Sequence, residues 1–135
     1  MIPRLKFALA LTCAACAAAA AASETTRARV QRDVEGYAIA SCLTYQSEPY
    51  LRAQGDGWAS SIVQSGKGKV EVLARLAEQV KQELPKVSMV MTPSASGVGH
   101  ETALPILYCH MLIDRPAVRA AIRKAVAALA PAYQR

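Results

Sequence analysis

The chain has 135 residues and a mass of 14.4 kDa, which allows one domain at most. Hydrophobic residues make up 53% of the sequence, but many of them lie in one alanine-rich block, residues 7–22. The formal net charge is +6, yet aromatic residues reach only 5% and do not interleave with basic ones, which argues against a nucleic-acid partner.

The alanine-rich block has the features of a secretory signal peptide. It is too short and too weakly hydrophobic to span a bilayer. Arg4 and Lys6 precede it, and Ala20–Ala22 offer the small residues that a signal peptidase needs. We therefore expect residues 1–22 to be removed on export and residues 23–135 to form the domain. No later segment is apolar and long enough for a membrane span, so we expect no membrane contact after cleavage.

Two of the cysteines belong to the expected domain. Cys13 and Cys16 lie in the signal peptide, and neither follows the leucine pattern of a lipoprotein. Cys42 and Cys109 remain after export, and an oxidising compartment favours a single disulfide between them. The chain-entropy model gives such a crosslink about 4 kcal/mol of stability. The alternative is a pair of buried free thiols.

The exported part has a helical pattern nearly throughout, with apolar residues at steps of three and four. Helices are expected over residues 24–45, 47–63, 69–84, 102–113 and 114–131. The first places Cys42 and Tyr45 on its inner stripe, and Gly55 and Gly57 are expected to weaken or kink the second. The fourth is apolar almost all round, so we expect it to be buried at the centre. The predicted fold class is all-α, a compact bundle of about five helices with one disulfide.

Polar residues and prolines mark the expected helix boundaries. Ser47 is the predicted cap of the second helix and Asp114 that of the fifth, each with a proline in the first turn. Pro85 and Pro131 are expected to end the third and fifth helices. The expected inner face of the third helix consists of Val70, Leu73, Ala74, Ala77, Val80 and Leu84.

Residues 85–101 have no helical period. Residues 87–91 are briefly strand-like, and the small residues of 92–100 favour a loop. Long loops without structure of their own tend to be functional or disordered. The segment is therefore either a plain connector or a binding element.

Catalytic and metal-binding patterns are missing. Ser94, Ser96 and His100 share a loop, but they lack the strand that precedes a serine hydrolase nucleophile. Cys109 and His110 are neighbours on a helix and point about 100 degrees apart, so neither activates the other. His110 is expected to be packed or half-buried. Zinc-ligand spacing and a phosphate-binding loop are also missing, so we predict a protein that is no enzyme and has no cofactor or metal.

Arg115, Arg119 and Arg123 form a stripe at every fourth position of the fifth helix. The stripe is either a solvated face or a docking surface for an acidic partner. Association through such a surface weakens as salt rises.

Two cysteine neighbourhoods carry a family resemblance. Residues 36–43, Gly-Tyr-Ala-Ile-Ala-Ser-Cys-Leu, and residues 107–113, Leu-Tyr-Cys-His-Met-Leu-Ile, resemble the two cysteine-centred helices of the type VI secretion amidase immunity family. The order of signal peptide, first cysteine helix, middle helices and second cysteine helix is similar too. The family's Lys-Cys pair and Tyr-His-Ser turn are replaced here by Tyr108-Cys109 and Asp114-Arg115-Pro116.

The resemblance implies a periplasmic immunity protein that binds and inhibits a type VI secreted peptidoglycan amidase. Such a protein protects the producing cell from its siblings. Members of the family act as homodimers with a protruding loop in the amidase cleft. The residues of this chain expected to enter the cleft are Ser94, Ser96, Gly97, Val98, Gly99 and His100. The alternative is an exported helical binding or envelope-maintenance protein without a toxin partner.

Overall fold

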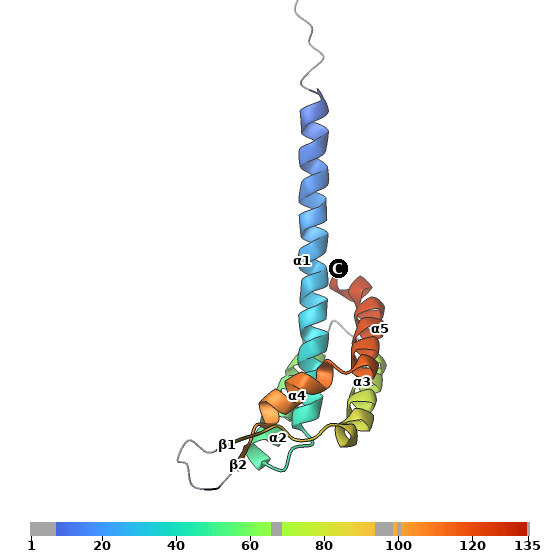
Figure 1. Ribbon diagram of the computed structural model, residues 1–135. Helices are drawn as coiled ribbons and strands as arrows, with labels where there is room; N and C mark the ends of the chain where they lie inside the picture. Colours follow the sequence, from blue (N-terminus) through green and yellow to red (C-terminus); the bar gives the residue numbers. More distant parts are fainter. Residues whose placement is uncertain (1–7, 66–68, 94–98, 100, 135) are drawn as a thin grey trace, which may run out of the picture.

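The computed structural model describes the backbone of residues 8–65, 69–93, 99 and 101–134, with side chains from residue 26 onward in these ranges. The elements in chain order are α1 Ala8–Leu43, α2 Pro49–Gln64, α3 Val70–Glu83, the 3-10 helix η1 Leu84–Lys86, β1 Met91–Pro93, β2 Glu101–Ala103, α4 Pro105–Ile113 and α5 Pro116–Tyr133 (Figure 1). The predicted all-α bundle of about five helices is confirmed. A small two-stranded hairpin, which we did not predict, is added to it.

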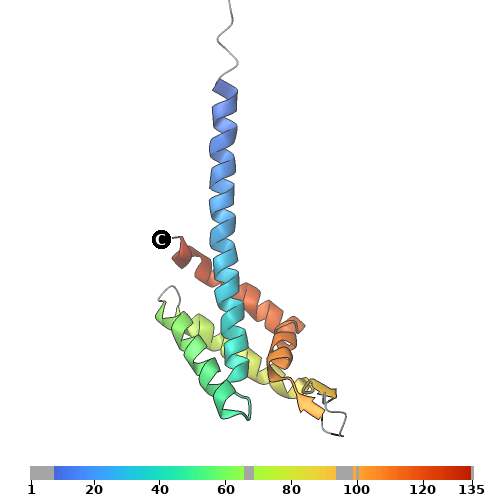
Figure 2. The ribbon, with the colours of Figure 1, turned by 90° about the vertical axis from the view of Figure 1, so that its left-hand side faces the viewer.

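Helix α1 is the column against which the other helices pack. Helices α2, α3, α4 and α5 all contact α1, and they surround only its C-terminal half (Figures 1 and 2). The N-terminal half of α1 stands clear of them in both views. Val30 is the first buried side chain among those described, so the core begins beyond the predicted signal peptide.

One face of α1 supplies the centre of the core. Val30, Val34, Ala38 and Cys42 are buried there as predicted, because steps of four residues keep them on one side of the helix. Tyr45 is 49% exposed, contrary to our prediction, since the helix ends before it. The largest fully buried side chains of the molecule include Leu76, Leu112, Ile122, Leu129, Val80 and Val118.

The buried face of α3 differs from the one that we predicted. Val70 and Ala74 are exposed, whereas Val72 and Leu76 are buried. Apolar residues occur on both sides of this helix, so periodicity alone leaves the choice open. Contact with α1 on one side and α5 on the other selects the observed face.

Helices α2 and α5 begin with proline rather than with a side-chain cap. They start at Pro49 and Pro116, and the residue before each makes no cap hydrogen bond through its side chain. The predicted caps Ser47 and Asp114 are therefore wrong. Proline suits a first helical position because its φ is already helical and its missing N–H needs no partner. The predicted end of α5 at Pro131 is also wrong, because the helix runs through this residue to its last turn.

Helices α1 and α2 approach each other closely at Gly55. A Cβ at this position would lie 2.7 Å from the carbonyl oxygen of Ala40 and 2.9 Å from the backbone nitrogen of Thr44. Gly57, by contrast, is exposed and has open space around it. Helix α2 runs unbroken through both glycines. Gly55 therefore allows two backbones to pack, a role that the sequence pattern did not reveal.

Candidate functional site

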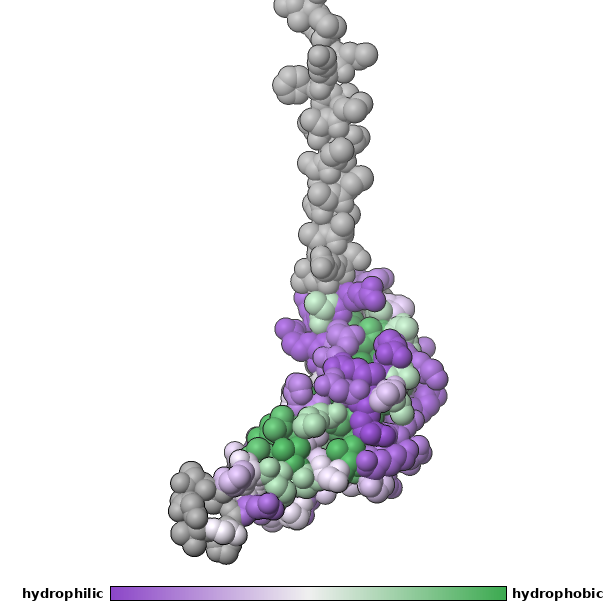
Figure 3. Space-filling model, viewed as in Figure 1, coloured by the Kyte–Doolittle hydropathy of each residue, from purple (hydrophilic) through white to green (hydrophobic). Residues whose placement is uncertain are grey.

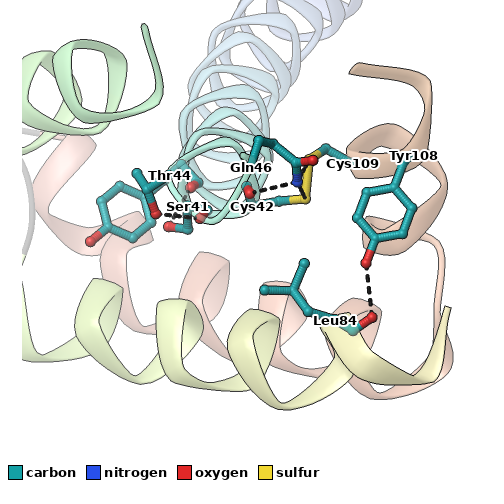
Figure 4. The surroundings of a disulfide bond; sticks show 8 residues. Ser41, Cys42, Thr44, Gln46, Leu84, Tyr108 and Cys109 are labelled. Carbon is teal, nitrogen blue, oxygen red and sulfur yellow. Dashed lines mark hydrogen bonds between the residues drawn. A yellow bond between two sulfur atoms is a disulfide. The ribbon is translucent and has the colours of Figure 1, made fainter. Parts of the chain in front are cut away.

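A buried disulfide ties α4 to α1. The sulfur atoms of Cys42 and Cys109 are 2.04 Å apart, and 67 residues separate the two cysteines in the chain. Both cysteines are fully buried. The side-chain amide of Gln46 donates to the carbonyl oxygen of Cys42 at 3.1 Å and lies 3.5 Å from Cys109 Sγ (Figure 4). The predicted disulfide is confirmed, and its surroundings are closed to solvent.

A hydrogen bond ties α4 to η1, the short helix that follows α3. Tyr108 Oη donates to the carbonyl oxygen of Leu84 at 2.8 Å (Figure 4). Burial raises the pKa of Tyr108 above its ordinary value, so the hydroxyl keeps its proton. Because Tyr108 and Cys109 are neighbours, a single turn of α4 is held from two directions. The orientation of the whole short helix follows from these two anchors.

The outer side of α4 is apolar and exposed. Ile106 is 64% exposed, Leu107 44% and Met111 49%. The prediction that this helix lies buried at the centre is therefore wrong. Helix α4 packs one side against α1, and the described part of the chain holds no element that covers these three side chains. Figure 3 shows the resulting hydrophobic surface near the hairpin end of the molecule.

The hairpin of β1 and β2 lies beside this surface. Its register pairs Met91 with Ala103, Thr92 with Thr102 and Pro93 with Glu101. The predicted helix start at Thr102 is wrong, because this residue pairs in β2 and α4 begins at Pro105. Met89 and Met91, before and within β1, are also exposed. We call the three exposed apolar residues of α4, Ile106, Leu107 and Met111, the hydrophobic end surface.

A shallow hollow of about 420 Å³ lies where β2 leads into α4. Its lining consists of Ala103, Leu104, Pro105, Ile106, Leu107 and His110. His110 is exposed rather than packed or half-buried as we predicted, because it lies on the outer side of α4. Large apolar side chains exposed together are unfavourable in water, and on globular proteins they are typical of interaction sites. Methionines suit such a surface because their flexible side chains adapt to the partner.

The residues predicted to enter a cleft connect the two strands. Ser94, Ser96, Gly97, Val98 and His100 lie outside the described residues. Gly99 is described, is exposed, and has a φ of +47°. That φ lies in the left-handed region, which glycine adopts without strain. Among the residues that the structure describes, none comes within 4 Å of a Cβ added at Gly99.

The arginine stripe of α5 takes part in the fold. Arg115 Nε donates to Glu83 Oε2 at 2.7 Å, and Arg119 pairs with both Glu35 and Asp114. Neither the solvated-face interpretation nor the docking interpretation anticipated these ion pairs. They connect α5 to α1 and α3 and leave Arg123 as the exposed member of the predicted stripe.

Glu83 joins the end of α3 to the start of α5. Its side chain is buried and accepts hydrogen bonds from Lys86 at 2.6 Å and Arg115 at 2.7 Å. The bonds from Lys86 and then Arg115 hold the pKa of Glu83 below its ordinary value, so the carboxylate stays ionised. Lys86 belongs to η1 and Arg115 precedes α5, so this cluster ties the end of α3 to both of these elements.

The described residues bring no three histidine, cysteine or acidic side chains together as metal ligands. Within the same residues, no helix combines the length and apolar character that crossing a membrane requires.

Comparison with known proteins gives no relatives: no protein-family model, curated protein or solved structure matches this chain. The resemblance in the two cysteine neighbourhoods therefore stays a prediction.

Sequence reasoning missed the hydrophobic end surface. An apolar helix is typical both of a buried centre and of a binding surface, and the number of elements available to cover it decides between them. Helix α4 has only nine residues and follows a hairpin that leaves one side open. The strand-like residues before Thr92 were the signal for that hairpin, although the strand itself begins at Met91.

Proposed function

We propose that this chain is a periplasmic immunity protein that binds and inhibits a type VI secreted peptidoglycan amidase. The observation that carries the proposal is the hydrophobic end surface beside the β1–β2 hairpin. Large apolar side chains exposed together are stabilised when a protein packs on them and excludes water. An inhibitor needs such a surface next to an element that can enter a cleft, and this end of the molecule offers both.

The anchoring of α4 supports a role in tight binding. Cys109 and Tyr108 hold the helix against α1 and η1, so the backbone that carries Ile106, Leu107 and Met111 is in place before any partner arrives. A partner then binds without the entropic cost of ordering this helix. A helix held in place before binding favours the tight binding on which inhibition at equal molar ratio depends.

Export is supported by two features of α1. A buried disulfide is typical of proteins that fold in an oxidising compartment. The N-terminal half of α1 stands apart from the other helices (Figures 1 and 2), so removal of residues 1–22 leaves the packed core intact. Deletion of residues 1–22 should abolish protection of cells, because inhibitor and amidase would then occupy different compartments.

In this proposal the segment between the strands blocks the cleft and the hydrophobic end surface seals its rim. Ser94, Ser96 and His100 supply polar groups, Val98 supplies an apolar tip, and Gly97 adds no side-chain bulk. Gly99 has a φ of +47°, which glycine adopts without strain. Arg123 adds positive charge that speeds encounter with an acidic partner. The protein acts as a homodimer, as the resemblance implies.

The test is inhibition of an amidase encoded immediately upstream, measured on purified peptidoglycan. Ile106→Asp should weaken inhibition by roughly a hundredfold, because it buries a charge at the interface. Val70→Asp is the matched control, since Val70 is a similarly exposed apolar residue at the start of α3. Gly97→Trp tests the segment between the strands, since its bulk should prevent insertion. Circular dichroism checks that each variant folds.

Equal inhibition by the Ile106→Asp and wild-type proteins would remove the hydrophobic end surface from the mechanism. Full inhibition by Gly97→Trp would remove the segment between the strands. If the wild-type protein inhibits no neighbouring amidase, the alternative takes its place, an exported binding protein without a toxin partner. Light scattering of the mature protein, with and without the amidase, checks the homodimer.

A further inference from the structure

Trp58, the single tryptophan of the chain, lies exposed in a place that the proposed function does not use. It stands on α2, and its side chain is 43% exposed. A Cβ at Gly36 of α1 would lie 2.9 Å from Cζ2 and 3.3 Å from Cε2 of the indole. The glycine therefore allows the ring to rest directly against the α1 backbone. Helices α2 and α4 lie on opposite sides of α1 (Figure 2), so this indole is separate from the hydrophobic end surface.

A shallow hollow of about 400 Å³ lies beside the indole. Its lining consists of Ala28, Gln31, Arg32, Glu35, Gly36, Ile39 and Trp58. This volume falls within the roughly 300–1,000 Å³ of small-molecule sites. One wall is therefore an aromatic ring, and a row of polar side chains along α1 forms another.

The polar row is held in place before any ligand binds. The amide of Gln31 donates to Glu35 Oε1 at 2.7 Å, and the guanidinium of Arg119 donates to the same oxygen. The carboxylate of Glu35 thus has a fixed direction. The side chain of Arg32, one residue after Gln31, is 77% exposed, and its Nε lies 4.0 Å from Asp33 Oδ1.

We propose that Trp58 and this polar row form a binding site for an acetamido-bearing pyranose saccharide. A pyranose ring has an apolar C–H face that stacks on an indole and a rim of hydroxyls that bond to carboxylates and amides. An acetamido group adds a carbonyl that accepts from a guanidinium such as Arg32. A protein partner fits less well, since the core of a protein interface is depleted of charged residues, whereas Arg32 and Glu35 both line this hollow.

The test uses the mature protein and triacetylchitotriose as the probe, with maltotriose, which lacks acetamido groups, as the comparison. Trp58 is the only tryptophan, so its fluorescence reports directly on the site. We expect the fluorescence of Trp58 to change saturably with triacetylchitotriose, at a Kd of about 1 mM, which is the affinity of a shallow site. Maltotriose should bind at least tenfold more weakly. The measurement needs no amidase, so its outcome is independent of the inhibition experiments.

Two variants assign the binding to the hollow, with calorimetry as the readout. Trp58→Ala and Arg32→Ala should each weaken triacetylchitotriose binding tenfold or more. Tyr50→Ala is the matched control, because Tyr50 is an exposed aromatic residue on the same helix outside the hollow. No fluorescence change, equal binding of the two saccharides, or unchanged binding by Trp58→Ala would each overturn the proposal. If the wild-type protein binds no saccharide and Trp58→Ala loses amidase inhibition, the saccharide site is overturned and the indole belongs to a protein interface.

Discussion

Loss of the disulfide between Cys42 and Cys109 should destabilise the mature protein strongly. The perturbation is made in two ways, by reduction of the wild-type protein and by the double variant Cys42→Ala, Cys109→Ala. Reduction keeps every side-chain atom and removes only the crosslink. The alanine pair also removes both sulfurs from a site that is fully buried, so it adds a packing defect.

The expected size of the effect follows from the length of chain that the crosslink closes. The cysteines are 67 residues apart, and the chain-entropy model converts a loop of that length into about 4 kcal/mol. For a domain of this size, 1 kcal/mol lowers Tm by about 4 °C, so the reduced protein should melt about 15 °C below the oxidised one. The alanine pair should melt lower still, because its cavity adds to the lost crosslink.

Urea and thermal unfolding, followed by circular dichroism, measure these differences. The oxidised state of the starting material is checked by mass with and without reductant. A Tm shift of only a few degrees in the reduced protein would show that native packing, rather than the crosslink, holds α4 against α1. In that case the orientation of the hydrophobic end surface would depend on Tyr108 and the core residues of α4 instead.

Three further predictions concern the rest of the fold. Gly55→Ala should lower the free energy of unfolding by about 1–3 kcal/mol, because its Cβ clashes with the α1 backbone. Gly57→Ala should raise it by about 0.5–1 kcal/mol, because the position has open space. Urea unfolding that gives both changes the same sign would contradict the packing argument. Folding lowers the pKa of Glu83 from 4.5. The ionised carboxylate therefore stabilises the fold above pH 4.5, and this stabilisation is lost as the pH falls through the folded pKa. Glu83→Gln should remove this part of the acid dependence of Tm. Burial, together with the hydrogen bond to Asp33, raises the pKa of Tyr133 to about 12. The protonated hydroxyl therefore stabilises the fold below pH 10, and this stabilisation is lost as the pH rises from 10 toward about 12. Tyr133→Phe should flatten the alkaline decline of Tm.

Periodicity and cysteine chemistry predicted the parts of the fold that depend on one helix at a time. The stripe of Val30, Val34, Ala38 and Cys42 on α1 is buried because a single helix face repeats every three or four residues. The disulfide followed from cysteines on two such faces. These features need no knowledge of which helix packs against which.

The wrong predictions concern features that depend on how several helices pack against one another. The inner face of α3 depends on the placement of α1 and α5, and the exposure of Ile106 depends on the lack of a covering element in the described residues. Prolines at the starts of α2 and α5 made a side-chain cap unnecessary, so Ser47 and Asp114 were misassigned. The ion pair of Arg119 with Glu35 joins residues that lie 84 positions apart in the chain, and no local pattern reveals it.

The position of the disulfide has a consequence for the protein after proteolysis. A cut between β1 and β2 would divide the chain into a piece that carries Cys42 and a piece that carries Cys109. The sulfur–sulfur bond would keep the two pieces in one molecule, with α4 and α5 still attached to α1. The nicked protein would persist as a two-chain species, which separates only when the disulfide is reduced.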